Sequence, residues 1–205
     1  MEYTINAGIL KGVALAIPKN MDVRNYLNGI NVSGTPCGRF LMLEATDGHI
    51  MIRSAILDYP SPEKSFVIPR SMVENLKVSQ SQKRLPLTIT YDGENIGIVW
   101  NGATATASTL ADSYPETSRI VPLARPSWET SVLDVDLLVR LRKAAALIGE
   151  DKSPQPVIGY NGLNATRVLF RGVEDSQFVI MPMTQQVLTM FPDGDLPTQA
   201  WANPA

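Results

Sequence analysis

Apolar residues recur at intervals of three and four in three stretches of the chain, and this spacing predicts three helices. The first stretch runs from about Ala7 to Asn28, but Pro18 should end or kink a helix there because proline lacks the N–H that a helix interior needs. Pro69 suits the start of the second helix, and Asp134 is a plausible N-cap for the third. The apolar positions are Ile9, Leu10, Val13, Ala14 and Ile17, then Met72, Val73 and Leu76, then Leu137, Leu138, Leu141, Ala145 and Ile148.

Short alternating or apolar runs follow each predicted helix. Asp-Gly pairs at 47–48 and 92–93 and an Asn-Gly pair at 161–162 divide these runs, and such pairs are typical of tight turns between antiparallel strands. The expected strands are 40–46, 49–53, 65–68, 87–91, 96–100, 103–110, 157–160, 167–170 and 177–181. The order strand, helix, then two or three antiparallel strands therefore occurs three times in units of roughly 60 residues, which predicts an α+β protein built from repeated half-domains.

The prolines indicate where these units are joined. Residues 113–126 contain three prolines and no amphipathic pattern, so we expect a connection there. The expected division is a domain of two half-domains at 1–122, a third half-domain at 123–183 and a C-terminal tail at 184–205. Its last part, residues 192–205, has three prolines and few large apolar residues, which predicts loose order.

Composition narrows the functional classes. The chain has 205 residues, 44% of them hydrophobic, which is enough for a real core. It has no run of 18 apolar residues, so we expect no membrane-spanning helix. The start lacks the pattern of a signal peptide, so we expect the protein to stay in the cytoplasm where it is made. A single cysteine, Cys37, excludes an internal disulfide and a multi-cysteine metal site.

Candidate catalytic residues are few. His49 is the only histidine and flanks a turn, where a structural role is the usual one, and Cys37 lies in a stretch rich in glycine and proline. Asp193 and Asp195 lack further carboxylates at a metal-binding spacing, and no phosphate-binding loop or dinucleotide fingerprint occurs. We therefore expect no catalytic residue, no metal and no cofactor, which means that the protein is not an enzyme.

Three strings, in this order along the chain, carry a family resemblance. Residues 45–49 read Ala-Thr-Asp-Gly-His, residues 113–122 read Ser-Tyr-Pro-Glu-Thr-Ser-Arg-Ile-Val-Pro, and residues 178–183 read Phe-Val-Ile-Met-Pro-Met. Together with the repeated order of strand, helix and antiparallel strands, these strings resemble the bacterial DNA polymerase sliding clamp, the beta subunit of DNA polymerase III. The resemblance covers about residues 1–183. The sequence also departs from that family, because clamps have three domains of two half-domains each and their Met-Pro-Met is usually followed by a basic residue and the chain end. Here there is room for three half-domains, and Thr184 and a tail follow.

The resemblance implies a clamp-like fold, with the helices on one face of the sheets, and a function in DNA replication. The protein would be a processivity factor that encircles duplex DNA without sequence preference and binds partner peptides in an apolar pocket. The implied partners are a DNA polymerase and, as an open question, a clamp loader. A short viral or prophage version of the clamp is the expected origin. The residues expected at the partner pocket are Phe178, Met181, Pro182 and Met183.

Assembly follows from the same resemblance. Clamp rings contain roughly twelve half-domains in closed symmetry, so three half-domains per chain favour a homotetramer over a trimer or dimer. In that ring the edge strands of the first and third units are expected to pair across subunits. An alternative function is a clamp-fold interaction protein or decoy that binds a host clamp or polymerase through the tail. Gln185, Leu188 and Phe191 have the spacing of clamp-docking peptides, and this segment could dock in the protein's own pocket, on a partner or nowhere.

Charge separates the helical segments from the rest of the chain. Residues 7–28, 69–84 and 135–152 carry +2, +3 and +1, which leaves −8 for the remainder of a chain whose net charge is −2. Basic helices on an otherwise acidic protein suit phosphate contact without base recognition, although a solvated helix face would look similar. The candidate DNA-binding residues are Lys11, Lys19, Arg24, Arg70, Lys77, Lys83, Arg84, Arg140, Arg142 and Lys143.

Overall fold

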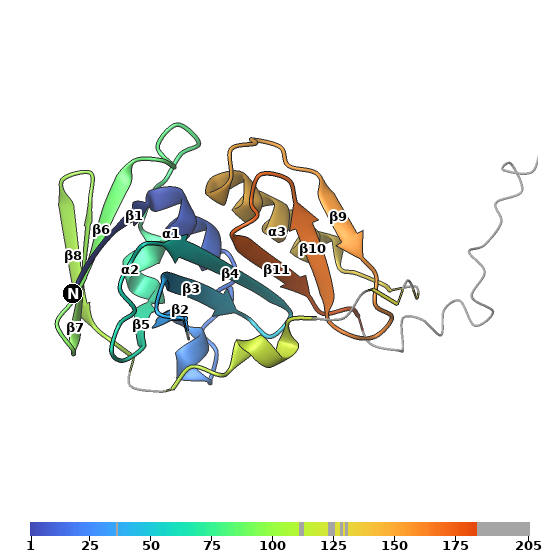
Figure 1. Ribbon diagram of the computed structural model, residues 1–205, viewed down its shortest axis with the longest axis horizontal. Coiled ribbons are helices and arrows are strands. Elements are labelled where there is room, and N and C mark those ends of the chain that lie inside the picture. Colours follow the sequence, from blue (N-terminus) through green and yellow to red (C-terminus); the bar gives the residue numbers. More distant parts are fainter. Residues whose placement is uncertain (36, 111–112, 123–125, 128, 130, 184–205) are drawn as a thin grey trace, which may run out of the picture.

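The computed structural model describes residues 1–35, 37–110, 113–122, 126–127, 129 and 131–183 (Figure 1). Within them, each of three helices is followed by three strands. The elements are β1 (Glu2–Asn6), α1 (Ala7–Ala14), β2 (Gly29–Gly34), β3 (Phe40–Thr46), β4 (Ile50–Leu57), β5 (Phe66–Pro69), α2 (Arg70–Glu74), β6 (Pro86–Tyr91), β7 (Asn95–Trp100), β8 (Ala103–Ser108), α3 (Val135–Ile148), β9 (Pro156–Gly159), β10 (Thr166–Phe170) and β11 (Ser176–Ile180), with short 3₁₀ helices at Asn25–Leu27 and Thr117–Ile120. The predicted α+β class is confirmed.

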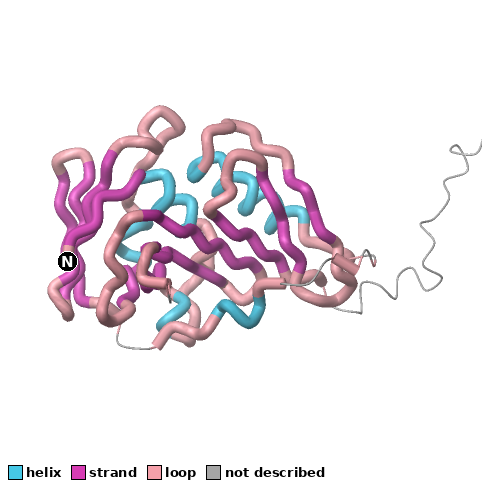
Figure 2. The backbone as a smooth tube through the Cα atoms, viewed as in Figure 1, coloured by secondary structure: helices cyan, strands magenta, loops and turns pink. Residues whose placement is uncertain are grey.

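In the described part of the chain, all strand pairs are antiparallel and form two sheets. The order is β1-β6-β7-β8 in the smaller sheet and β5-β2-β3-β4-β11-β10-β9 in the larger one. The smaller sheet lies at the end of the molecule that carries the N-terminus (Figure 2). The strand before α1 pairs with β6, and the strand before α2 pairs with β2, so the first two helix-and-strand runs exchange their first strands. The third run joins the larger sheet through β11, which pairs with β4.

This last pairing corrects one expectation. The edge strands of the first and third runs were expected to pair across subunits, but β4 and β11 pair with each other inside the chain, from Ile50 opposite Ile180 to Ser54 opposite Ser176. The two strands continue one sheet, so the edges of β4 and β11 are not free for a second subunit, whereas β9 of the third run remains an edge strand. Any contact between subunits must therefore use other edges.

Alternation along the central strands puts the helices on one face of the larger sheet. Leu41, Leu43 and Ala45 of β3 are buried in the core that contains the helix residues Leu10 and Leu141. The helices pack side by side in the order α2, α1, α3, and α1 and α3 come especially close because Gly8 and Gly12 face the end of α3 (Figure 1). A Cβ on Gly8 would lie 2.3 Å from the carbonyl oxygen of Leu147. None of the described helices is long and apolar enough to cross a membrane.

The opposite face of the larger sheet is crossed by residues 113–122, the predicted connection. Glu44 is buried on this face, where its carboxylate accepts hydrogen bonds from Arg53 at 2.9 and 3.0 Å, from Asn31 at 2.8 Å and from the hydroxyl of Thr117. Further along, Val121 packs on the sheet beside β11. Residues 113–122 are therefore bonded to this face of the sheet, and they run along it from β3 toward β11.

Two elements differ from the sequence-based expectation. The first helix ends at Ala14 and continues only as tight turns to Ile17, because Pro18 stops it; residues up to Asn28 form a loop and a 3₁₀ helix instead. The strands β1 and β2 were not predicted, although β1 alternates between exposed and buried positions as a half-buried strand should. The β3–β4 and β6–β7 turns fall at the predicted Asp-Gly pairs, where Gly48 and Gly93 take positive φ angles.

Candidate functional site: a cleft at Met181–Met183 beside a basic helix layer

A cleft of about 580 Å³ lies where the β3–β4 turn, the loop after α1, the start of α3 and the end of β11 meet. It brings together segments that are far apart in the sequence, including two of the strings that carry the family resemblance. Its lining residues are Pro18, Lys19, Asn20, Met21, Asp22, Asp47, His49, Asp134, Leu137, Arg140, Met181, Pro182 and Met183.

The β3–β4 turn is built by side chains that bond to their own backbone. One carboxylate oxygen of Asp47 accepts hydrogen bonds from the backbone N–H groups of His49 and Ile50, both at 2.9 Å. Gly48 between them has a φ of 90°, a conformation that glycine adopts without strain. The carbonyl oxygen of His49 then accepts a hydrogen bond of 2.8 Å from the N–H of Met181. This turn and the end of β11 are thus held together directly.

Arg140 fixes the floor of the cleft from α3. Its guanidinium donates to the second carboxylate oxygen of Asp47 at 2.6 Å, to the carbonyl oxygen of Leu15 at 2.8 Å and to that of Ile17 at 3.2 Å. The carbonyls at the end of α1 have no partner within the helix, so a cation from α3 satisfies them. Since both oxygens of Asp47 are used, one in the turn and one in this ion pair, the shape of the cleft is set by bonds between three elements.

The apolar lining of the cleft includes three methionines beside Pro18, Leu137 and Pro182. Met181 and Met183 are 36% and 39% exposed, and Met21 on the loop opposite is 73% exposed. Flexible thioether side chains can adapt to several ligands, so they suit a surface that accepts extended peptides. The backbone under them is fixed, because the N–H of Met183 donates to the carbonyl oxygen of Val132 at 2.8 Å.

Phe178 does not lie with Met181, Pro182 and Met183, the other residues expected at the partner pocket. It is 2% exposed and meets Phe170 edge to face, with ring centroids 5.0 Å apart, in the core under the helices. Successive strand residues point to opposite faces, and Phe178 belongs to the helix-facing set. It supports the strand that carries Met181 and does not line the cleft.

Several predicted DNA-binding cations bond within the fold. Lys83 is 7% exposed, and its Nζ donates to the carbonyl oxygens of Ala146 at 2.7 Å and Glu150 at 3.3 Å, so it closes the end of α3. Burial lowers the pKa of Lys83. Lys11 donates to the carbonyl oxygens of Val73 and Glu74, and burial lowers its pKa as well. These contacts differ from the expectation of a phosphate-facing surface, and we leave Lys83 out of the DNA interface proposed below.

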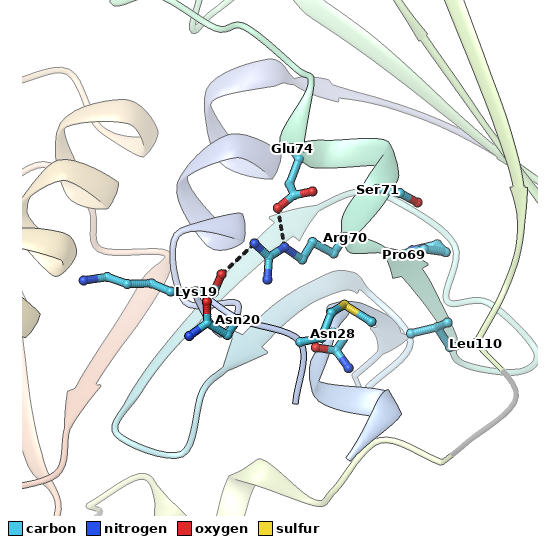
Figure 3. Close-up of a pocket in the computed structure, with 9 residues that line it drawn as sticks. Lys19, Asn20, Asn28, Pro69, Arg70, Ser71, Glu74 and Leu110 are labelled. Atoms are coloured by element: carbon cyan, nitrogen blue, oxygen red, sulfur yellow. Dashed lines mark hydrogen bonds and ion pairs between the residues drawn. The ribbon is translucent and has the colours of Figure 1, made fainter. Parts of the chain in front are cut away.

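The arginines are also engaged. Arg70 extends from α2 between the carboxylate of Glu74 and the carbonyl oxygens of Pro18 and Lys19, at 2.8 and 2.7 Å, beside a hollow of about 500 Å³ (Figure 3). Arg24 pairs with Asp22 at 2.9 Å, and this pairing holds the pKa of Asp22 at about 2. The remaining predicted arginines, apart from Arg140, are Arg84, which pairs with Glu150, and Arg142, which bonds to Ser153 and Pro154.

A second groove, of about 320 Å³, runs between the three helices and shares Lys19 and Arg140 with the cleft. Its lining contains five cations against one carboxylate, so its net charge is positive. The charged lining residues are Lys11, Lys19, Arg70, Arg140, Lys143 and Glu74. Lys19 and Lys143 are exposed there, and Lys77 is exposed after α2. The helix layer thus presents a positive groove next to an apolar cleft.

Two antiparallel sheets, a helix layer on one face and this arrangement of runs define the fold of a DNA sliding clamp. Solved structures share it: the DNA polymerase III subunit beta of Borrelia burgdorferi has a TM-score of 0.69 at 14% identity over 90% of this chain and 64% of its own. The DNA polymerase III subunit beta of Pseudomonas aeruginosa has a TM-score of 0.65 at 16% identity, over 90% of this chain and 66% of its own. The sliding clamp of Bacillus subtilis has a TM-score of 0.66 at 13% identity, over 90% of this chain and 64% of its own. The chain thus spans less than two thirds of the first of these proteins. No protein-family model and no curated protein sequence matches it.

The structure does not describe every sequence-predicted feature. The Gln185–Phe191 segment and the pair Asp193 and Asp195 lie outside the described residues. Conversely, the sequence did not predict that Asp47 and His49 line the cleft, or that Arg140 bonds to Asp47. The Asp-Gly turn was visible as a turn, but its contact with β11 depends on the tertiary pairing of β4 with β11.

Proposed function

We propose that this chain is a sliding-clamp-type processivity factor without enzymatic activity, which acts in DNA replication in the cytoplasm. It would hold duplex DNA against its helix layer and bind partner peptides in the cleft at Met181–Met183. The observation that carries the proposal is the joining of the β3–β4 turn to the end of β11. Arg140 and the hydrogen bond from Met181 to His49 build one cleft from two strings that the sequence separates.

The partner proposed for the cleft is an extended segment of a DNA polymerase. Exposed methionines provide apolar contacts, and the rim offers Lys19 and Asp22 for polar ones. For DNA, the groove between the helices places exposed lysines where phosphates could approach without base recognition. A clamp loader and a viral or prophage origin belong to the same proposal, as further steps that rest on the family resemblance.

Ring assembly completes the proposal. The exchange of first strands between the runs of α1 and α2 supports a domain at 1–122, with 123–183 as a third half-domain and 184–205 as a tail. Four such chains would supply the roughly twelve half-domains of a closed ring.

The test of the proposal replaces Met183 with Asp and measures the affinity for a labelled polymerase peptide by fluorescence polarisation. A buried carboxylate in an apolar cleft is costly, so we expect affinity to fall at least about tenfold. Val23→Asp is the matched control, because Val23 is 96% exposed on the neighbouring loop and does not line the cleft. Equal affinities of the Met183 variant and the control would contradict the proposed cleft.

A further inference from the structure

One wall of the cleft, the loop at residues 18–22 that carries the exposed Met21, is fixed at both ends. At its start, the guanidinium of Arg70 donates to two carbonyl oxygens of the loop, at 2.8 and 2.7 Å (Figure 3). At its end, the side chain of Asn28 bonds to both the N–H and the carbonyl oxygen of Asp22, each at 2.8 Å. A wall held in this way cannot close over the methionines opposite, so the cleft keeps its volume of about 580 Å³ and its apolar lining stays open to a ligand.

The carboxylates of the cleft are already bonded within the protein. Asp47 pairs with Arg140 at 2.6 Å, and Asp22 pairs with Arg24 at 2.9 Å. The third carboxylate, Asp134, accepts a hydrogen bond from a backbone N–H of α3. A ligand therefore meets mainly the three methionines, which are 36% to 73% exposed. An uncharged apolar segment suits such a site, because a charge buried without a partner is costly.

The chain carries a segment of this composition directly after the cleft. Met183 lines the cleft and is the last described residue, and residues 184–205 follow it. Residues 184–191 read Thr-Gln-Gln-Val-Leu-Thr-Met-Phe, without a charge, and four of the last five are apolar. The aspartates of the tail come later, at Asp193 and Asp195. The part of the chain that is tethered at the cleft thus has the composition that the cleft favours.

The tether is short and leaves the cleft at a fixed point. The N–H of Met183 donates to the carbonyl oxygen of Val132 at 2.8 Å, which holds the exit of the chain in place. A loop of about two to five residues is enough to reverse a chain, and the polar residues 184–186 provide one before the apolar residues 187–191. A segment on such a short tether has an effective concentration on the order of 1 mM at the cleft.

We propose that residues 187–191 of the chain's own tail occupy the cleft in the same molecule, with their apolar side chains against the methionines. A partner peptide binds only when it displaces this segment, so the tail sets the affinity that a partner must exceed. The inference rests on the proposed peptide-binding role of the cleft and names the segment that fills it before a partner arrives. It depends neither on DNA binding nor on ring assembly.

Competition in the full-length chain tests the inference. The probe is a fluorescent synthetic peptide with the sequence of residues 184–191, and fluorescence polarisation measures its affinity. Leu188→Asp/Phe191→Asp removes two apolar side chains from the tethered segment, so this variant should bind the probe at least about tenfold more tightly than the unmodified chain. Thr198→Asp/Ala200→Asp adds the same charge after the segment and should bind the probe as weakly as the unmodified chain. Equal affinities of all three proteins would contradict the inference.

Two further variants show where the tail binds. Met183→Asp, added to Leu188→Asp/Phe191→Asp, should abolish probe binding, and a probe that still binds would lie outside the cleft and contradict the inference. A full-length Met183→Asp chain keeps its tail but lacks a working cleft. Added at a concentration below the dissociation constant of the probe, it should not displace the probe from the Leu188→Asp/Phe191→Asp variant. Displacement would mean that the tail docks in a second copy, which would overturn the assignment to the same molecule.

The results also separate this inference from the proposed function. A polymerase peptide that binds the unmodified chain, together with a probe that does not bind the Leu188→Asp/Phe191→Asp variant, would refute the tail as the occupant and leave the proposed cleft intact. If neither peptide binds that variant, both the inference and the proposed cleft are wrong.

Discussion

At the scale of single residues, similar charges have different roles in this protein. Lys83 and Lys143 both belong to basic helical segments, yet Lys83 is buried against the end of α3 and Lys143 is exposed in the positive groove. Charge counting pointed to the helix layer but could not separate these two lysines, because burial depends on how α3 packs against the residues before β6. The same limit explains why Phe178 was assigned to the cleft that Met181 lines.

The buried position of Lys83 predicts a pH effect on stability. Burial lowers the pKa of Lys83 in the folded state. At pH values between this lowered pKa and the pKa in the unfolded chain, the unfolded chain therefore binds more protons than the folded one. The free energy of unfolding relative to Lys83→Met should therefore rise with pH between the lowered folded pKa and the unfolded value of about 10.4. Urea unfolding of both proteins at several pH values measures it. A pH-independent difference would show that the Lys83 ammonium is not destabilised by its site.

At the scale of elements, local signals predicted more than distant ones. Asp-Gly turns, the N-cap at Asp134 and the stop at Pro18 all appear in the structure, because a few neighbouring residues decide each of them. Asp134 accepts hydrogen bonds from the N–H groups of Asp136 and Leu137, as a cap should. The bond between Glu44 and Thr117, which holds residues 113–122 on the sheet, joins residues far apart in the sequence. No local sequence pattern predicts it.

That anchor predicts a large effect of a small change. Glu44→Gln keeps the size of the side chain but leaves the Arg53 guanidinium without its anionic partner in a largely buried site. Removing one member of a buried pair costs about 3 to 5 kcal/mol, and we expect the free energy of unfolding to fall by about 3 kcal/mol. Chemical denaturation measures this loss. Glu63→Gln, an exposed site, is the control and should change stability by less than about 0.5 kcal/mol.

At the scale of the whole molecule, the proposed function depends on surfaces that only the assembled fold creates. The positive groove needs α1, α2 and α3 together, and the methionine cleft needs the third run docked on β4. The sequence predicted both kinds of surface through its charge pattern and its family resemblance. It could not predict that they adjoin, sharing Lys19 and Arg140, because this depends on the packing of α1 against α3.

The groove predicts sequence-independent, salt-dependent DNA binding. Exposed lysines at 19 and 143 lie in a lining with a net positive charge, while the chain as a whole carries −2, so attraction to phosphates should be confined to the helix layer. Lys19→Glu/Lys143→Glu should weaken binding to unrelated duplexes alike. Each lost phosphate contact should reduce the slope of log affinity against log salt by about 0.9. The matched control is Arg39→Glu/Lys64→Glu, which makes the same charge change at exposed positions outside the groove. Fluorescence anisotropy on two duplexes of different sequence, across a salt series, measures both quantities. If the control pair weakens binding as much as the groove pair, net charge and not the helix layer attracts the DNA, and the proposed interface is wrong.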